Sequence, residues 1–153
     1  MSASVAIVLG SKSDQDHVKS TTDLLDSFGV EWEMKFLSAH RQPEKLHAYV
    51  REAEQSGVRL FIAVAGLSAA LPGVIGSISK LPVIGLPVPA GALKGIDALL
   101  SMTQMPGGIP VATVGVGSNG SKNAAVLAAE ILALSDDGVS AKLEAYREKM
   151  KNA

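Results

Sequence analysis

A histidine and an arginine stand side by side in the segment Ser38-Ala39-His40-Arg41, directly after an apolar run. Histidine takes up and releases protons near neutral pH, so His40 is a candidate general acid and base. The planar guanidinium of Arg41 has a donor geometry that suits a phosphate or a carboxylate. A solvated turn without function is the alternative interpretation. Because the pair combines a proton carrier with an anion clamp, we favour a catalytic site.

A second candidate segment is Gly10-Ser11-Lys12-Ser13-Asp14. Gly10 frees the turn, the two serine hydroxyls can donate, and the N-terminus of a following helix attracts anions. The carboxylate of Asp14 can accept from ribose hydroxyls. An ordinary capped turn is equally compatible with this pattern, and the glycine spacing of a Walker loop is missing.

The third candidate segment is AGLSAALPG at residues 65–73. Its small residues let a ligand approach the backbone, and the amides beyond Gly66 could bind an oxygen of a carboxylate or of CO2. A tight turn that packs a helix on a sheet explains the spacing equally well.

Other kinds of site are not indicated. The chain has no cysteine, which excludes disulfides and thiolate metal sites. No cluster of His, Asp and Glu has metal-site spacing, so we predict no metal. His17 and His47 fall within predicted helices, and we expect both on the surface. No serine lies at a nucleophile elbow.

The elements that must position these residues alternate regularly. Apolar runs predict strands over residues 5–9, 30–37, 60–65, 82–86 and 109–116. Helices are predicted over residues 13–28, 43–56, 69–79, 93–103, 122–134 and 138–151. Such alternation predicts an α/β fold, a three-layer doubly wound parallel sheet of flavodoxin-like order 2-1-3-4-5 with a C-terminal helix. Ligands in such sheets bind beyond the carboxyl ends of the strands, where all three segments fall.

We expect one nucleotide-binding domain over residues 1–153, whose terminal helix (136–153) docks on its own domain or on a neighbouring subunit. Residues 82–100 carry little charge, which burial between subunits would explain. A buried strand followed by a core-facing helix is the other explanation; we favour a homo-oligomer.

Composition excludes two classes of protein. The formal net charge of −1 argues against a nucleic-acid-binding protein, which normally presents a basic face. Charged residues, glycine or proline interrupt every apolar run, and the first residues lack the basic region of a signal peptide. We therefore expect a cytoplasmic protein without a membrane span.

Taken together and in order, the motifs resemble the family of N5-carboxyaminoimidazole ribonucleotide mutases and phosphoribosylaminoimidazole carboxylases of purine biosynthesis. The resemblance extends over almost the whole chain. It rests on GSKSD at 10–14, SAHR at 38–41 with Pro43, AGLSAALPG at 65–73, LPV at 81–83, LKGIDALLS at 93–101, QMPGGIPVATV at 104–114 and KNAAVLAAEIL at 122–132.

The resemblance implies a role for each matching residue. His40 would be the acid/base that moves the proton at carbon 4 of the imidazole, and Arg41 would bind the phosphate. The carboxyl group would leave the exocyclic nitrogen as CO2, stay trapped and be attacked by carbon 4. The family is typically octameric, and the reaction uses no cofactor. The implied substrate-binding residues are Gly10, Ser11, Ser13, Asp14, Ser38, Arg41, Gly66, Leu67, Ser68 and Leu71.

One departure affects the carboxyl donor. The mutase pattern has a second histidine where this chain has Ala70, and the branch that uses free CO2 lacks that histidine and has a serine near the position of Ser68. The ending Leu71-Pro72-Gly73 and residues 93–114 resemble the mutase branch, which we favour. Direct carboxylation by CO2, a carboxylase of a pyridine dinucleotide and a non-catalytic nucleotide-binding oligomer are the alternatives.

Overall fold

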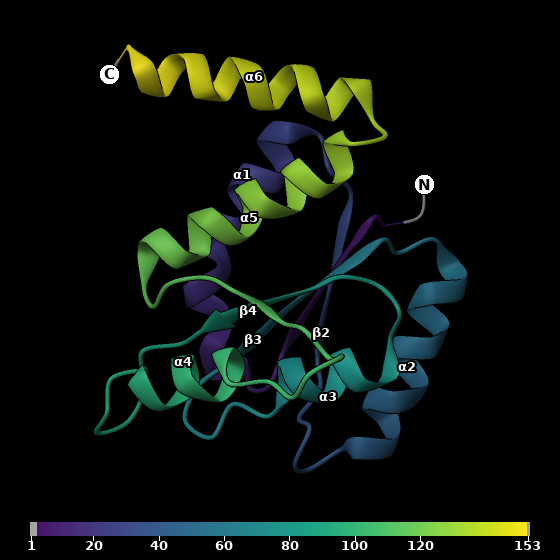
Figure 1. Cartoon of the computed structure of the whole chain (residues 1–153), viewed down its shortest axis with the longest axis vertical. Helices are drawn as coiled ribbons and strands as arrows, with labels where there is room; N and C mark the ends of the chain where they lie inside the picture. Colours follow the sequence, from purple (N-terminus) through teal and green to yellow (C-terminus); the bar gives the residue numbers. More distant parts are fainter. Residues whose placement is uncertain (1–2, 153) are drawn as a thin grey trace.

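The computed structural model describes residues 3–152, and its centre is a five-stranded parallel sheet (Figure 1). The strands lie in the order β2-β1-β3-β4-β5, so the predicted fold class and strand order are confirmed. Every neighbouring pair is parallel. The strands are β1 (Val5–Leu9), β2 (Trp32–Phe36), β3 (Leu60–Ala65), β4 (Val83–Pro87) and β5 (Ala112–Thr113).

Helices connect the strands and follow the last of them. Pro43 stands in the first turn of α2. The backbone N–H that proline lacks would have no partner within the helix at this position, so no hydrogen bond is lost. The helices are η1 (Lys12–Val18), α1 (Lys19–Phe28), α2 (Pro43–Ser56), α3 (Leu71–Ile78), α4 (Ile96–Thr103), α5 (Ser118–Ala133) and α6 (Asp137–Lys151).

The core has two parts, one on each face of the sheet. Val5, Ile7 and Leu9 of β1 pack with α1 and α5 on one face, while Ala6 and Val8 pack with α2, α3 and α4 on the other. Figure 1 shows the same division, with α1, α5 and α6 on one side of the strands. Because both faces are covered, β1, β3 and β4 are buried along their whole length, which explains their continuous apolar sequences.

Four predicted elements differ clearly from the structure, and one of them, the helix predicted over 122–134, begins four residues earlier, at Ser118. The first helix begins as the 3₁₀ helix η1, so α1 starts only at Lys19. The fourth begins at Ile96 rather than residue 93, because Lys94 (φ 49°) and Gly95 (φ 92°) are left-handed. The fifth strand pairs only at Ala112 and Thr113 instead of over 109–116. Pro110 has no N–H to donate, which limits the strand on its N-terminal side.

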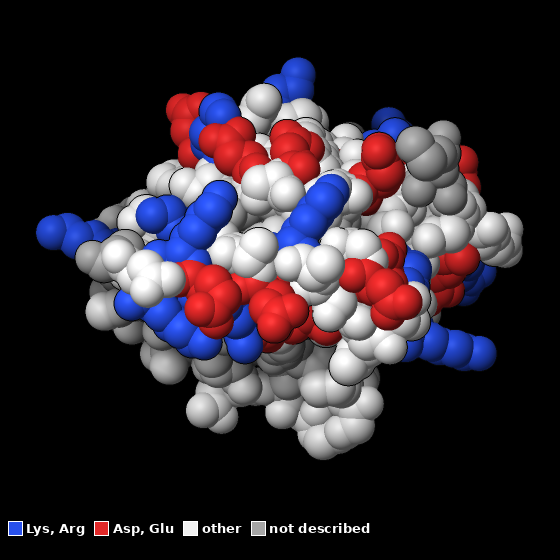
Figure 2. Space-filling model, turned by 90° about the horizontal axis from the view of Figure 1, so that it is seen from above, with Lys and Arg blue, Asp and Glu red and all other residues white. Residues whose placement is uncertain are grey.

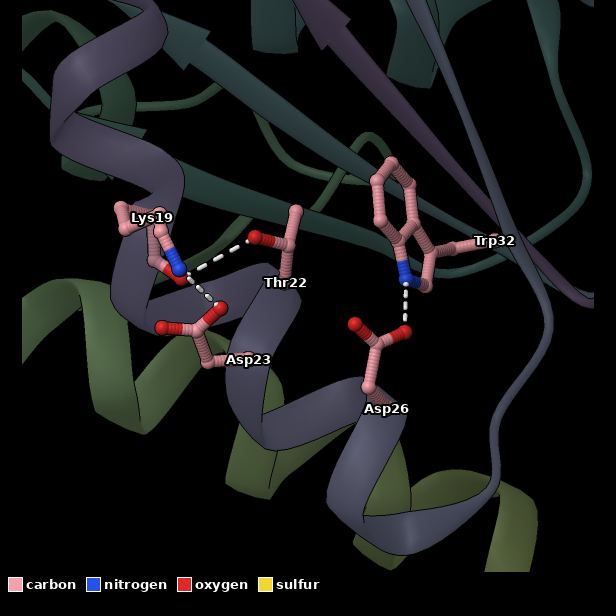
Figure 3. Close-up of polar contacts among 5 residues, drawn as sticks. All are labelled: Lys19, Thr22, Asp23, Asp26 and Trp32. Carbon is pink, nitrogen blue, oxygen red and sulfur yellow. Dashed lines mark hydrogen bonds and ion pairs between the residues drawn. The ribbon is translucent and has the colours of Figure 1, made fainter.

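The edge strand β2 is attached to α1 by a side-chain hydrogen bond. The indole N–H of Trp32 donates to Asp26 Oδ1 at 2.8 Å (Figure 3). On the same helix, the hydroxyl of Thr22 donates to the backbone carbonyl of Lys19. The side-chain ammonium of Lys19 forms an ion pair with Asp23. Lys35 of β2 is exposed, whereas Trp32, Met34 and Phe36 are half-buried and pack against the core.

The terminal helix α6 packs on α5 and α1 of its own chain. Val139 and Leu143 are buried, and the ring of Tyr146 meets Phe28 edge-on at 5.4 Å. Met150, near the end of the same helix, is 62% exposed. Seen from above, this end of the molecule mixes basic and acidic side chains and forms no patch of one sign (Figure 2).

The first turn of α5 passes directly against the backbone that follows β5. A Cβ at Gly120 would overlap the carbonyl group of Gly115, so only glycine fits there. We expect Gly120→Ala to reduce the free energy of unfolding by about 3 kcal/mol. The melting temperature should fall by roughly 6–12 °C. Gly107→Ala is the matched control, because a Cβ there would meet nothing within 4 Å. Equal melting temperatures for the two variants would contradict this packing.

Candidate active site

A cleft of about 490 Å³ opens at the carboxyl ends of the strands. Its walls are the segments that follow β1, β2 and β3, and Ala90 after β4 completes them. All eleven residues predicted from the sequence line this one cleft: Gly10, Ser11, Ser13, Asp14, Ser38, His40, Arg41, Gly66, Leu67, Ser68 and Leu71. The strand order explains the convergence, because β1 lies between β2 and β3.

The segment after β1 forms a hydroxyl cluster. Ser11 caps η1 by accepting from the N–H of Ser13 at 3.3 Å, and the Ser13 hydroxyl lies 2.9 Å from Ser11 Oγ. The N–H of Gly10 donates to the carbonyl of Val64 at 3.0 Å, which fixes the start of the turn on β3. The sequence allowed two interpretations of residues 10–14, a ligand-binding segment and an ordinary capped turn. The structure shows a capped turn that also lines the cleft, so the two interpretations do not exclude each other.

Asp14 stands at the back of this cluster and is only 8% exposed. Burial, the largest influence, raises the pKa of its carboxyl above the ordinary value. A hydrogen bond from Ser13, the charge of nearby His17 and a backbone bond at Ser11 act in the opposite direction on this pKa. A carboxylate that burial has partly desolvated is well suited to accept hydrogen bonds from hydroxyl groups of a ligand, since these would replace the lost water.

The segment after β2 forms a turn that leads into α2. The N–H of Arg41 donates to Ser38 Oγ at 3.2 Å, and that of Gln42 donates to the Ser38 carbonyl at 2.9 Å. The guanidinium of Arg41 reaches across and donates to the carbonyl of Gly10 at 3.1 Å. Arg41 therefore holds the first two walls of the cleft together, while its exposed remaining donors face solvent. His40 is exposed beside it.

The segment after β3 supplies backbone and small side chains. Leu67 has a φ of 54°, in the left-handed region, and Ala69 and Leu71 are buried. The N–H of Ala70 donates to the carbonyl of Ser68 at 2.9 Å. Among the hydrogen bonds of residues 3–152, none has the N–H of Leu67 or Ser68 as its donor. Free amides in this part of the wall are suited to an anionic oxygen.

The cleft is thus divided by chemistry. The β1 and β2 segments contribute hydroxyls, a carboxylate, an imidazole and a guanidinium. The β3 and β4 segments contribute mainly alanine, glycine and leucine, with Ser68 as their hydroxyl. A ligand with an anionic end and a flat, less polar end would place the former at the first side and the latter at the second.

Ala90 and the lining alanines (Ala39, Ala65, Ala69 and Ala70) were not predicted as site residues. A methyl group carries no chemical signal, and only the position of Ala39, Ala65, Ala69 and Ala70 within the candidate segments pointed to them, whereas Ala90 lies in none of these segments. His17 and His47 are exposed and lie outside the cleft, as predicted. Within residues 3–152, no group of three or more His, Asp or Glu is placed to hold a metal ion. The helices of that same range include none long and apolar enough to span a bilayer.

Comparison with known proteins decides the family. The profile of a family described as AIR carboxylase matches residues 4–153. The chain belongs to this family. The family resemblance that the motifs indicated is therefore confirmed.

Curated relatives and solved structures of this family cover nearly the whole chain. The N5-carboxyaminoimidazole ribonucleotide mutase of Pyrococcus abyssi is 51% identical over 147 residues, which are 96% of this chain and 83% of the relative. The mutase of Bacillus subtilis is 46% identical over 96% of this chain and 91% of its own. The crystal structure of Treponema denticola PurE superposes with a TM-score of 0.88 at 34% identity, covering 97% of this chain and 91% of that one.

The buried carboxyl of Asp14 predicts a pH effect on stability. Because its pKa is raised in the folded protein, the free energy of unfolding falls as the pH rises from the unfolded pKa through the folded one. Asp14→Asn should remove this dependence and raise the melting temperature at pH 7 by about 2–4 °C. Thermal melts between pH 4 and pH 7 measure both effects. Asp16→Asn, at an exposed carboxylate on the same 3₁₀ helix, is the control. A lower melting temperature for Asp14→Asn at pH 7 would show that the ionised Asp14 stabilises the fold, contrary to this prediction.

Proposed function

We propose that this chain interconverts N5-carboxyaminoimidazole ribonucleotide and 4-carboxyaminoimidazole ribonucleotide in purine (IMP) biosynthesis. The observation that carries the proposal is the single cleft in which His40, Arg41 and the Ser11–Asp14 cluster meet. Relatives named as this mutase, at 45% and 51% identity, support the same substrate. The enzyme would be an isomerase.

The division of the cleft suggests how the nucleotide binds. The phosphate would lie against the guanidinium of Arg41 and the hydroxyls of Ser11 and Ser13, because these are the donors of the polar side. The ribose hydroxyls would donate to Asp14. The imidazole ring would then point toward the β3 segment, with His40 at its edge.

The proposed chemistry balances with a single acid/base. The bond between the carboxyl carbon and the exocyclic nitrogen breaks, the electron pair stays on nitrogen, and the nitrogen takes up a proton. Carbon 4 then attacks the released CO2, and the ring loses the proton of carbon 4 to become aromatic again. One proton is taken up and one is released, so His40 can serve both transfers. The balance needs no metal, biotin or ATP.

A second candidate is direct carboxylation of aminoimidazole ribonucleotide by free CO2, in which case the enzyme would be a lyase. The observation that favours it is Ala70, which lines the cleft with a methyl group where the mutase pattern has a histidine. Ser68 lies on the same wall, where the direct carboxylases have a serine. The two candidates share the nucleotide, His40 and the carbon–carbon bond formed, and differ only in the source of CO2.

Replacing His40 tests the proposal, and comparing donors separates the two candidates. His40→Asn should lower turnover by at least about 100-fold because the proton carrier is lost, while nucleotide binding changes little. Turnover is measured with the N5-carboxylated nucleotide, or with aminoimidazole ribonucleotide, bicarbonate and carbonic anhydrase. His47→Asn, at an exposed histidine outside the cleft, is the control. Full activity of His40→Asn would contradict the proposed role of His40. If the wild-type protein binds the nucleotide but converts neither donor, a non-catalytic function is favoured.

We also propose a cytoplasmic homo-octamer. Leu93, Ile96 and Leu100 are more than half exposed (57%, 58% and 54%) within the segment of low charge, and an isolated chain would leave them in water. The β4 part of that segment is buried within the chain and needs no partner. We expect light scattering to give a mass eight times the 15.8 kDa of one chain, and Ile96→Glu to lower that mass. A wild-type mass of 15.8 kDa would contradict assembly.

A further inference from the structure

We propose that the outward side of α2 is a contact surface for α2 of a second copy of this chain, packed antiparallel across a two-fold axis. The surface, called the α2 hollow below, is a groove lined by Pro43, Glu44, His47, Ala48 and Arg51. The inference assigns a specific contact within the proposed assembly, and it does not depend on the proposed activity.

The shape of the α2 hollow is that of a helix-packing site. It has a volume of about 460 Å³, and all of the residues that line it belong to α2. Glu44, His47, Ala48 and Arg51 stand at positions i, i+3, i+4 and i+7 of the helix. Four residues with this spacing form the hole that receives a side chain of a facing helix. The small side chain of Ala48 leaves room for such a side chain to enter.

The α2 hollow is not used by the packing of its own domain. α2 packs on the core through Leu46, Val50 and Ala53. The residues that line the α2 hollow are all exposed. Figure 1 shows α2 at the margin of the molecule. This side of the helix is therefore accessible to another molecule.

The charges at the two ends of the α2 hollow favour a second copy as the occupant. Glu44 and Arg51 are seven residues apart, which separates them by roughly 10 Å along the helix axis. Among the ion pairs of residues 3–152, none includes either of them. When two copies of α2 pack antiparallel, Glu44 of each lies opposite Arg51 of the other, so one two-fold axis creates the same ion pair twice. A parallel arrangement would bring like charges together, which is unfavourable.

The centre of the α2 hollow suits the same arrangement. The antiparallel register that pairs Glu44 with Arg51 places His47 of each copy opposite Ala48 of the other. The larger side chain then fits against the smaller one, as close helix packing requires. His47 takes no part in the two ion pairs, so His47→Asn stays a suitable control for the assay of His40.

A self-complementary surface is what an assembly with two-fold axes needs, because both copies present the same patch to each other. The proposed α4 contact is apolar, through Leu93, Ile96 and Leu100. The α2 hollow instead carries one charge of each sign at a fixed spacing. The two surfaces therefore differ in chemistry, and charge reversal can test the α2 contact separately.

Charge reversal tests the reciprocal ion pairs. Glu44→Arg would place two arginines opposite each other at both ends of the contact, and Arg51→Glu would do the same with two glutamates. Each variant should dissociate at least about tenfold more readily on dilution, because like charges then meet. The double variant Glu44→Arg/Arg51→Glu recreates both pairs with the signs exchanged, so it should regain the wild-type mass. Light scattering over a dilution series measures the mass.

Glu52→Arg is the matched control, because Glu52 is an exposed glutamate of the same helix outside the α2 hollow. Its mass should equal that of the wild type at every concentration. Thermal melts show whether each variant is folded. If a charge reversal prevents folding, Glu44→Gln or Arg51→Gln takes its place and should also weaken the assembly.

A wild-type dilution profile for both single variants would overturn the inference. Dissociation of the single variants that the double variant does not reverse would also overturn it, because the α2 hollow would then face a different surface. A wild-type mass of 15.8 kDa at all concentrations would contradict this contact and the proposed octamer together. Turnover is not measured in this experiment, so failure of the proposed activity would leave the inference standing.

Discussion

The parallel pairing of β1 with both β2 and β3 is the constraint on which the rest of the structure depends. Parallel strands end at the same edge of a sheet, so the segments that follow β1, β2 and β3 must meet there. The same pairing requires crossover helices on both faces, which bury β1, β3 and β4 completely. The apolar sequences of these strands and the polar sequences after them are therefore two consequences of one arrangement.

The cleft combines groups that a purely structural region would avoid. Asp14 is a buried carboxylate, the N–H groups of Leu67 and Ser68 donate none of the hydrogen bonds within residues 3–152, and Leu67 has a left-handed backbone. Each of these features costs free energy by itself, and each would become favourable or useful toward a ligand with hydroxyls and an anionic group. The rigid sheet below tolerates them because its own groups are buried and paired. The buried sheet therefore supplies the stability of the molecule, and the segments that follow its strands supply the candidate site.

Much of this arrangement could be predicted from the sequence. The buried strands are recognisable as apolar runs, and short polar motifs follow them, so GSKSD, SAHR and AGLSAALPG could be identified as strand-end segments. The errors lie where local patterns compete. The run 109–116 is apolar enough for a strand, yet Pro110 cannot join a ladder and the strand shortens to two residues. Ala90 escaped notice because a methyl group gives no chemical signal.

By itself, the sequence determined the order of the elements, the parallel fold and the family to which the chain belongs. These follow from hydrophobic periodicity and from motifs that are local in the chain. Only the tertiary structure decided that Arg41 reaches the carbonyl of Gly10, 31 residues earlier, and that Leu67 fills the space beside Gly91. Such contacts depend on the distance between neighbouring strands and on the backbone angles of single loop residues. No local pattern encodes either quantity, because both arise only when separate segments are packed side by side on one sheet.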